Sequence, residues 1–423
     1  MKQARATLIV IGFLVFLGLP TSGGATLFAS PEFQVTYDRT DLPVAQGVAD
    51  RTWIWGPWPI NSGVDEAYAE SPGGIRHVQY FDKSRMEISD PHADPNSPWY
   101  VTNGLLVVEM ATGWMQMGDR TGEQRQPATQ NVAGDQTGDP RSPSYRTVAE
   151  LTVRNPRTLD EVIVERVGGD ATVARDEALA ALGVTNAVLV PETDHTVASV
   201  FWEFMNSTGI VNDQGTLTEG PLFLNSFYAT GFPITEAYWT TIPVGGEVRT
   251  VLFQCFERRC LTYTPENPPG WQVEAGNVGR HYYEWRYGGS PTAEAFVYFI
   301  AIAPDNAGPD IIGCGDALVE WITAVNTDRG PVAGALSSLL AFDPSTLDEL
   351  GLYSALTAWD VTVDTVAIDS GRATVHLSGS IQVGGACDVP RIQAQLERTV
   401  FQFGEIFAVD FYLNGEPLFD QLN

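Results

Sequence analysis

Cysteines and tryptophans are the residues whose types and spacing could do chemistry in this chain. All four cysteines follow residue 250 of the 423. Cysteine pairs form disulfides in oxidising compartments, and tryptophan rings stack on flat apolar ligand surfaces. Cys255 and Cys260 would lie about 17 Å apart on one straight strand, which is too far for a disulfide. If the four residues between them form a hairpin loop, the two cysteines face each other and can bond.

Cys314 and Cys387 are the second candidate pair. A disulfide between them would close a loop of about 72 residues, for which chain entropy predicts roughly 4 kcal/mol of stabilisation. Free buried thiols are the alternative interpretation. The cysteine spacing does not resemble a zinc site, because there is no CxxC motif and the histidines stand apart. We therefore predict two disulfides and neither a metal site nor a cofactor.

Several tryptophans are candidates for binding a sugar, because the CH faces of sugar rings suit flat apolar surfaces with polar rims. The alternative is that they fill the cores of short-stranded domains, and alternation along one strand would place two of them on the same core face. The candidate ligand-binding residues are Trp53, Trp55, Trp58, Trp99, Trp239, Trp271 and Trp285.

No catalytic motif is present: the sequence lacks GxSxG, HExxH, a Walker loop and a GxGxxG that opens a helix. Asp194, His195 and Glu203 form the most suggestive acid and imidazole group. However, Leu42 occupies the position of His195 in the repeat described below, so chemistry shared by both copies does not use this histidine. We predict no catalytic residue, although a carboxylate pair of the kind found in glycoside hydrolases cannot be recognised from sequence.

The composition describes a folded, acidic protein with more than one core. Hydrophobic residues make up 44% and charged residues 18% of the chain, and the formal net charge is −28. A chain of this length divides into several domains. Its negative field would repel a phosphate backbone, so we do not expect nucleic acid as a partner.

Residues 1–29 have the pattern of a secretory signal peptide. Lys2 and Arg5 precede an apolar run that ends before Pro20, and small residues follow. The run is shorter than the roughly 20 residues that span a bilayer, so a retained anchor is the weaker alternative. We expect a secreted or cell-surface protein that is not an integral membrane protein once the signal is cleaved.

Similar segments recur in the same order within the first 290 residues, which predicts a duplicated β-rich unit. The copies would span residues 30–120 and 148–288, and the second copy would carry insertions. Tyr80 and Arg85 then correspond to Cys255 and Cys260, so the first copy has the same hairpin without a disulfide. The charged residues at both hairpin tips are expected to be solvated. The matching segments are residues 40–46 and 193–199, 55–68 and 229–238, and 78–88 and 252–263.

Residues 121–147 are rich in Pro, Gly, Asp and Gln, which indicates a mobile linker between the copies. Asp135 and Asp139 could offer oxygen ligands to Ca²⁺, but they lack the spacing of an EF-hand loop, so a solvated linker is the favoured interpretation.

After residue 295 the pattern changes to an α+β layer domain of two helices and four strands. Strands are expected at residues 295–303, 359–369, 372–380 and 406–418, and helices at residues 330–342 and 388–403.

The phrases "GALSSLL", "VDTVAIDSGRATVHLSG" and "AQLERTVFQF" resemble the GerMN domain, which is named from bacterial spore germination and sporulation proteins. The resemblance covers residues 295–420. The sequence departs from the family pattern in having "LLAFDPS" in place of Leu-Leu-Gly-Pro, and "GCGD" where a basic residue is common. The predicted fold class is therefore α+β multidomain: a duplicated β-rich unit followed by a GerMN-like layer domain.

The GerMN resemblance implies a non-catalytic interaction or assembly module of the bacterial envelope, and the N-terminal region resembles an uncharacterised repeat of secreted bacterial proteins. The expected partners are cell-wall glycan or envelope proteins. A carbohydrate-active hydrolase and a purely structural surface protein are the alternatives.

Overall fold

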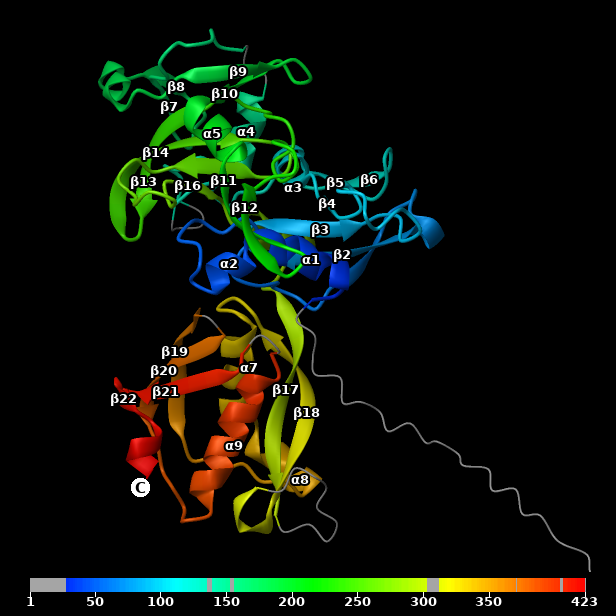
Figure 1. The fold of residues 1–423 in the computed structure, drawn as a ribbon, viewed down its shortest axis with the longest axis vertical. Coiled ribbons are helices and arrows are strands. Elements are labelled where there is room, and N and C mark those ends of the chain that lie inside the picture. The colour runs from blue at the N-terminus through cyan, green and yellow to red at the C-terminus, as the bar shows by residue number, and fades with distance from the viewer. Residues whose placement is uncertain are drawn as a thin grey trace, which may run out of the picture.

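The computed structural model describes residues 28–134, 139–152, 156–302, 312–369, 371–403 and 406–422. Nearly all of the predicted signal segment, residues 1–27, lies outside these ranges. The fold is a mixed α+β structure with several separate sheets. Figure 1 shows an N-terminal region, coloured blue to green, stacked on a C-terminal domain coloured yellow to red. Among the described residues, no helix is long and apolar enough to cross a membrane.

The N-terminal region consists of short helices around small sheets. Its helices are α1 (Pro31–Thr40), α2 (Leu42–Ala45), α3 (Leu106–Thr112), α4 (Tyr145–Leu151), α5 (Ser199–Met205) and α6 (Val278–Tyr287), with 3-10 turns at Pro72–Gly74 and Glu177–Leu182. The first sheet has the order β1 (Val64–Ala67), β2 (Ile75–Phe81), β3 (Ser84–Ile88) and β4 (Thr102–Asn103).

A six-stranded sheet dominates the second half of this region. Its order is β16 (Val273–Ala275), β15 (Cys260–Tyr263), β14 (Glu247–Cys255), β13 (Tyr238–Val244), β7 (Glu165–Val167) and β8 (Val173–Arg175). Three strand pairs stand apart from it: β5 (Trp114–Gln116) with β6 (Gly122–Gln124), β9 (Asn186–Val190) with β10 (His195–Ala198), and β11 (Thr208–Asp213) with β12 (Thr216–Pro221).

The β2–β3 and β14–β15 hairpins have corresponding hydrogen-bonded surroundings. Gln79 on β2 accepts from the N–H of Ala29 at 3.0 Å. Gln254 on β14 accepts from the N–H of Ala198 at 3.1 Å. In each case the helix α1 or α5 follows the donating alanine closely. A buried glutamine side chain therefore ties each hairpin to the start of a helix.

The helices that follow the hairpins contact the opposite hairpin. The N–H of Val108 in α3 donates to the carbonyl of Glu257 at 3.3 Å, and the N–H of Gly279 in α6 donates to that of Asp82 at 2.9 Å. Asp82 also forms an ion pair with Arg280, and Glu257 is half-buried. The expectation of solvated hairpin tips is therefore wrong, because each tip packs against a helix of the other half.

Charged side chains are buried beneath α6. Arg85 lies within 3.2 Å of Glu66 and within 3.5 Å of Glu109, and all three are nearly inaccessible. Arg286 of α6 reaches Glu66 at 3.3 Å, and the Tyr282 hydroxyl donates to Glu109. Together with Arg76 and Glu87, the cluster balances three positive and three negative charges, and it fixes α6 to the first sheet.

The two halves of the N-terminal region share hydrophobic cores. One cluster contains Tyr80 and Leu106 from the first half together with Phe253 and Tyr282 from the second. Residues 121–147 contribute Ala128 and Val132 to this core, so their described part is not the mobile linker that its composition indicates. The few apolar residues of the segment are enough to anchor it.

The matched segments at residues 40–46 and 193–199 lie in different elements. Asp41 follows α1 and precedes α2, whereas its counterpart Asp194 lies in the turn before β10, which comes before α5. Their similarity in sequence therefore does not correspond to a shared position in the fold.

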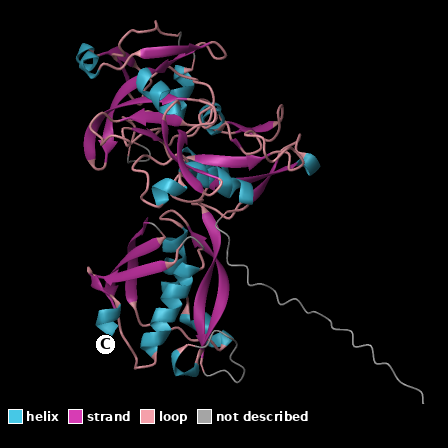
Figure 2. Ribbon diagram, viewed as in Figure 1, coloured by secondary structure: helices cyan, strands magenta, loops and turns pink. Residues whose placement is uncertain are grey.

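The C-terminal domain places helices between two sheets. The strands are β17 (Thr292–Ala301), β18 (Ala317–Asn326), β19 (Asp360–Asp369), β20 (Arg372–Ser380), β21 (Ala408–Leu413) and β22 (Glu416–Pro417). The helices are α7 (Pro331–Leu340), α8 (Pro344–Leu350) and α9 (Asp388–Phe401), with 3-10 turns at Gly313–Gly315 and Phe419–Leu422. Figure 2 shows the helices α7 and α9 between the β17–β18 hairpin and the β19–β22 sheet. The sequence predicts most of these elements but misses β18 and α8.

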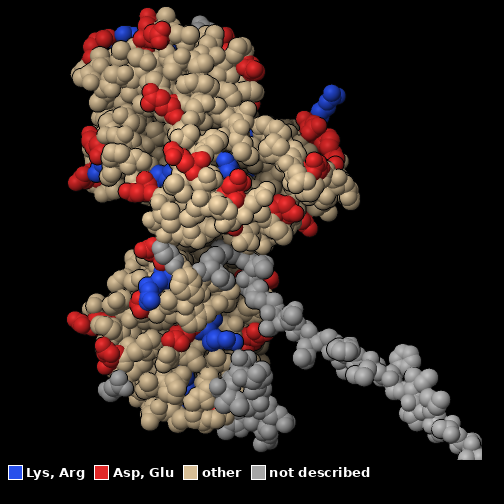
Figure 3. Space-filling view, in the orientation of Figure 1, with Lys and Arg blue, Asp and Glu red and all other residues tan. Residues whose placement is uncertain are grey.

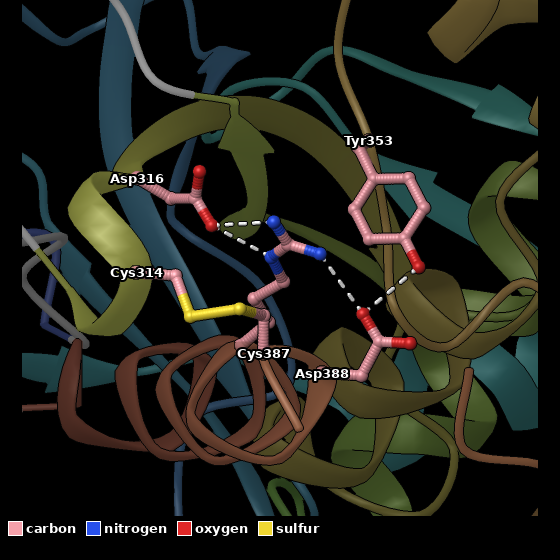
Figure 4. The surroundings of a disulfide bond; sticks show 6 residues. Cys314, Asp316, Tyr353, Cys387 and Asp388 are labelled. Carbon is pink, nitrogen blue, oxygen red and sulfur yellow. Dashed lines mark hydrogen bonds and ion pairs between the residues drawn. A yellow bond between two sulfur atoms is a disulfide. The ribbon is translucent and has the colours of Figure 1, made fainter. Parts of the chain in front are cut away.

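Both predicted disulfides are confirmed. Cys255 and Cys260 are paired across the β14–β15 hairpin, and Cys314 is bonded to Cys387 at the start of α9. Figure 4 shows the second disulfide beside Asp316, Asp388 and Tyr353. Arg391 bridges the two aspartates at 2.6 and 3.0 Å, so charge and covalent bond together fix the loop to the helix.

Candidate functional site

A cavity of about 640 Å³ lies where the N-terminal region meets the C-terminal domain. The N-terminal wall comes from α1, α2 and the segment 53–58. The opposite wall comes from the start of α7, from Ala367, Ile368 and Gly371 at the ends of β19 and β20, and from Phe403, Ile406 and Phe407 after α9. We refer to this cavity as the junction cleft.

Tyr37 fixes part of the N-terminal wall. It lies on α1, which begins at Pro31 with the Ser30 side chain accepting from the N–H of Phe33. The Tyr37 hydroxyl donates to the carbonyl of Pro57 at 2.6 Å, and its ring lies 5.1 Å from that of Phe28. Helix α1 therefore holds the chain beside Trp58 in place.

Asp41 holds the rest of this wall. Its carboxylate is fully buried and accepts from the N–H groups of Ile54, Trp55 and Gly56 at 2.9, 2.6 and 3.1 Å. Burial raises the pKa of Asp41 to about 6, while these donors and Arg51 act in the opposite direction. The Asp41 carboxylate thus fixes the conformation of the backbone between Trp53 and Trp58.

Trp58 also joins the two walls. A Cβ on Gly330 would lie 2.7 Å from the Trp58 ring, and Gly330 has a φ of +91°, so both space and backbone require glycine there. Nearby, the Thr327 hydroxyl donates to the carbonyl of Ile60 at 2.6 Å. The Arg280 side chain pairs with Asp328 at 3.0 Å. The junction is therefore a packed contact beside the cleft.

Phe407 lies at the edge of the C-terminal wall. Its side chain is 76% exposed, although Phe403 and Ile406 beside it are buried. The N–H of Phe407 donates to the carbonyl of Gly371 at 2.9 Å, and its ring covers that glycine so closely that a Cβ would overlap it. The backbone is thus fixed while an aromatic face remains open to solvent.

The lining of the cleft is almost entirely apolar. Apart from tyrosine and tryptophan, the polar side chains among its described lining residues are Asp38 and Gln46, and none of these residues is Lys, Arg or His. Such a surface favours hydrocarbon groups, because a polar ligand group would lose its hydrogen bonds to water without replacement.

The structure brings Trp53 and Trp58 together in the cleft and separates the other candidate tryptophans. Trp55 and Trp239 are buried, and the Trp239 indole donates to the carbonyl of Ile163. Both residues therefore belong to the hydrophobic core.

The remaining candidates lie elsewhere on the N-terminal region. Trp99 is 49% exposed, with its ring 5.6 Å from that of Tyr228. Trp271 donates to Asp50 at 2.7 Å, and Trp285 to the carbonyl of Gln126 at 2.9 Å. Both therefore join segments that are distant in the sequence.

His195 is buried, and its partner is Glu236 at 3.1 Å. Glu203 is exposed on α5. The suggestive group of the sequence is therefore not assembled, and Glu236, 41 positions away in the chain, gave no local signal.

Among the described residues, no three His, Cys, Asp or Glu side chains gather as they would around a metal ion. Asp135 lies outside those residues. The Asp139 carboxylate is paired with Arg141 at 2.9 Å.

A smaller polar pocket of about 170 Å³ contains Lys83, Glu274 and His281. The Lys83 amine donates to the carbonyl of Ala275 at 2.7 Å. Burial lowers the pKa of Lys83, and that of His281 to about 4. Burial therefore disfavours the charged forms of both groups relative to water, and Lys83 serves to join the two halves of the N-terminal region.

Comparison with known families identifies the C-terminal part. The Germane family, described as "sporulation and spore germination", matches residues 297–419. This part of the chain is therefore a GerMN (Germane) domain. No curated protein and no solved structure matches the chain significantly.

Proposed function

We propose that this chain, with its GerMN domain at residues 297–419, is a secreted, non-catalytic binding or assembly module of a bacterial envelope. The observation that carries the proposal is the junction cleft, where Trp53 and Trp58 form an apolar site of ligand size. Two disulfides are typical of an extracellular protein and support export.

We further propose that the β-rich halves arose by duplication. Support comes from pairs of corresponding hydrogen bonds. The N–H of Gly104 donates to the carbonyl of Arg85, and the N–H of Gly276 to that of Cys260. The contacts of Val108 and Gly279 with the two hairpin tips also correspond, because each residue donates its N–H to a backbone carbonyl at the tip of the opposite hairpin.

Cell-wall glycan and envelope proteins are the proposed partners. A nucleic acid is disfavoured by the acidic side chains scattered over both parts of the face in Figure 3, where Lys and Arg are few. For a glycan, Trp99 offers an exposed ring outside the cleft. The cleft and this ring are two distinct surfaces that variants can separate.

The test is co-sedimentation of the full exported chain with isolated cell walls, with soluble sugar measured in the same tubes. We expect sedimentation without sugar release, and a loss of at least fivefold in the Trp53→Ala/Trp58→Ala variant. Trp114→Ala is the matched control, because that ring is 43% exposed and does not line the cleft.

Three other outcomes would change the proposal. A loss of sedimentation in the Trp99→Ala variant alone would assign glycan binding to the Trp99 ring. Sugar release would favour the alternative of a carbohydrate-active hydrolase. No sedimentation of any form would contradict wall binding and leave an envelope-protein partner or a purely structural role.

A further inference from the structure

We infer that the junction cleft binds a single hydrocarbon chain of a lipid, such as an acyl or isoprenoid chain with an uncharged or cationic head group. The inference uses the cleft of the proposed function and names the class of its ligand.

The volume of the cleft suits one small ligand. Sites for small molecules commonly measure about 300–1,000 Å³ and bury most of the ligand. The cavity of about 640 Å³ lies within this range. It is also bounded on two sides by different parts of the chain, so a flexible chain can enter between them.

Polar partners are scarce among the described lining residues, which favours a hydrocarbon chain over a sugar or a peptide as the main occupant. Transfer of a hydroxyl or peptide group to an apolar site is unfavourable unless the group finds a hydrogen-bond partner there. A sugar ring carries several hydroxyls, and a peptide has a donor and an acceptor at nearly every residue. Asp38 and Gln46, at the cleft, already have partners of their own. A hydrocarbon chain has no such requirement.

Phe407 supplies the second observation. Large exposed apolar side chains that adjoin an apolar cavity mark binding surfaces. Burial of a phenylalanine side chain contributes favourable free energy in proportion to the apolar area removed from water. Since 76% of Phe407 is exposed, a chain that extends over the edge of the cleft would gain much of this contribution.

The charge around the cleft determines which head group the bound lipid can carry. Within the part of the chain that the structure describes, no Lys, Arg or His lines the cleft, whereas Asp38 does. The chain as a whole carries a net charge of −28. A carboxylate or phosphate at the opening would therefore meet repulsion, with no opposing charge among the described lining residues.

The test measures quenching of tryptophan fluorescence by brominated twelve-carbon chains below their micelle concentration. We expect saturable quenching by the alcohol and the trimethylammonium form, and binding of the carboxylate at least fivefold weaker. Phe407→Asp should weaken alcohol binding at least tenfold, because it places a charge at the edge of the apolar site. Val248→Asp is the matched control, since Val248 is 71% exposed and lies outside the cleft.

A second set of measurements identifies the source of the chain. Vesicles of zwitterionic lipid are compared with the monomeric alcohol. Binding of the monomer alone supports a free lipid, and additional capture by vesicles that Phe407→Asp abolishes supports a chain drawn from a membrane lipid.

Several results would overturn the inference: no saturable quenching, equal binding by Phe407→Asp, tighter binding of the carboxylate than of the alcohol, or displacement of the alcohol by an apolar peptide at lower concentration. Wall sedimentation that depends on Trp53 and Trp58 without any binding of the alcohol would refute the lipid and leave the proposed function. Binding of the alcohol without wall sedimentation would support the lipid and contradict the proposed wall binding.

Discussion

Asp41 connects the buried interior to the wall of the junction cleft. Its carboxylate accepts the three consecutive N–H groups of residues 54–56, so Trp53 and Trp58 protrude on either side of a fixed backbone. A charge buried in this way stabilises one local conformation at the cost of its own hydration.

Replacement of Asp41 by Asn should loosen the segment 53–58 and lower the free energy of unfolding, because an amide cannot accept all three bonds without opposing one donor with its own N–H. Glu192→Gln, on an exposed turn, is the control. Chemical denaturation at several pH values gives the measurement.

The contribution of Asp41 to folding stability depends on pH with a defined sign. Burial raises the pKa of Asp41 from 3.8 to about 6. The folded state therefore binds the proton more tightly, and this contribution to stability is present in full below pH 3.8 and is lost as the pH rises through 6. The stability difference between wild type and Asp41→Asn should be about 2 kcal/mol larger at pH 4.5 than at pH 7.5. A stability difference between wild type and Asp41→Asn that becomes smaller at acidic pH would contradict the raised pKa of Asp41.

At the scale of elements, the two disulfides close loops of very different length. Cys255 and Cys260 are 5 residues apart, and Cys314 and Cys387 are 73 apart. The short bond joins strands that already pair, whereas the long one ties the turn before β18 to α9.

Chain entropy predicts that replacing Cys314 and Cys387 by alanine costs about 4 kcal/mol, and replacing Cys255 and Cys260 about 2 kcal/mol. Each double variant serves as the control for the other. Thermal unfolding monitored by calorimetry should show the larger loss for the long loop, and the reverse order would indicate that packing of the buried Cys255 and Cys260 outweighs loop entropy.

The elements of the GerMN domain could be predicted from sequence because their patterns are local. Alternation predicts β20 and helical periodicity predicts α9, and both agree with the structure within a few residues. Strand β18 was missed because its middle is largely exposed and lacks clear alternation. The hairpin at Cys255–Cys260 was predictable because a disulfide between these two residues requires the chain to turn between them.

At the scale of the molecule, the cleft exists only because two parts of the chain meet. Residue type identified Trp53 and Trp58 as candidates, but nothing local in the sequence separates them from the buried Trp55. Phe407 gave no signal either, because its exposure depends on packing between residues distant in sequence. Long-range contacts, such as Thr327 with Ile60, determine the site.

Replacement of Gly330 by alanine should disturb this contact, because the new methyl group would overlap the Trp58 ring. We expect a loss of about 1–3 kcal/mol from overpacking. The two parts should then unfold in separate transitions, which calorimetry would resolve. Gly351→Ala is the matched control, since Gly351 also has a positive φ, +67°, but no atom within 4 Å of the position that a methyl group would take. Identical unfolding of both variants would show that backbone strain alone is responsible.

The reciprocal contacts between the halves of the N-terminal region also affect when the region can fold. Lys83 and its acceptor Ala275 are 192 residues apart, and α3 and α6 each cover the hairpin of the opposite half. Contacts of such separation are slow to form because a long loop must close first. The β2–β3 hairpin cannot obtain its final neighbours until residue 280 has left the ribosome. Slow completion of this kind would keep the chain open during synthesis, as the proposed export through a narrow translocation channel would require.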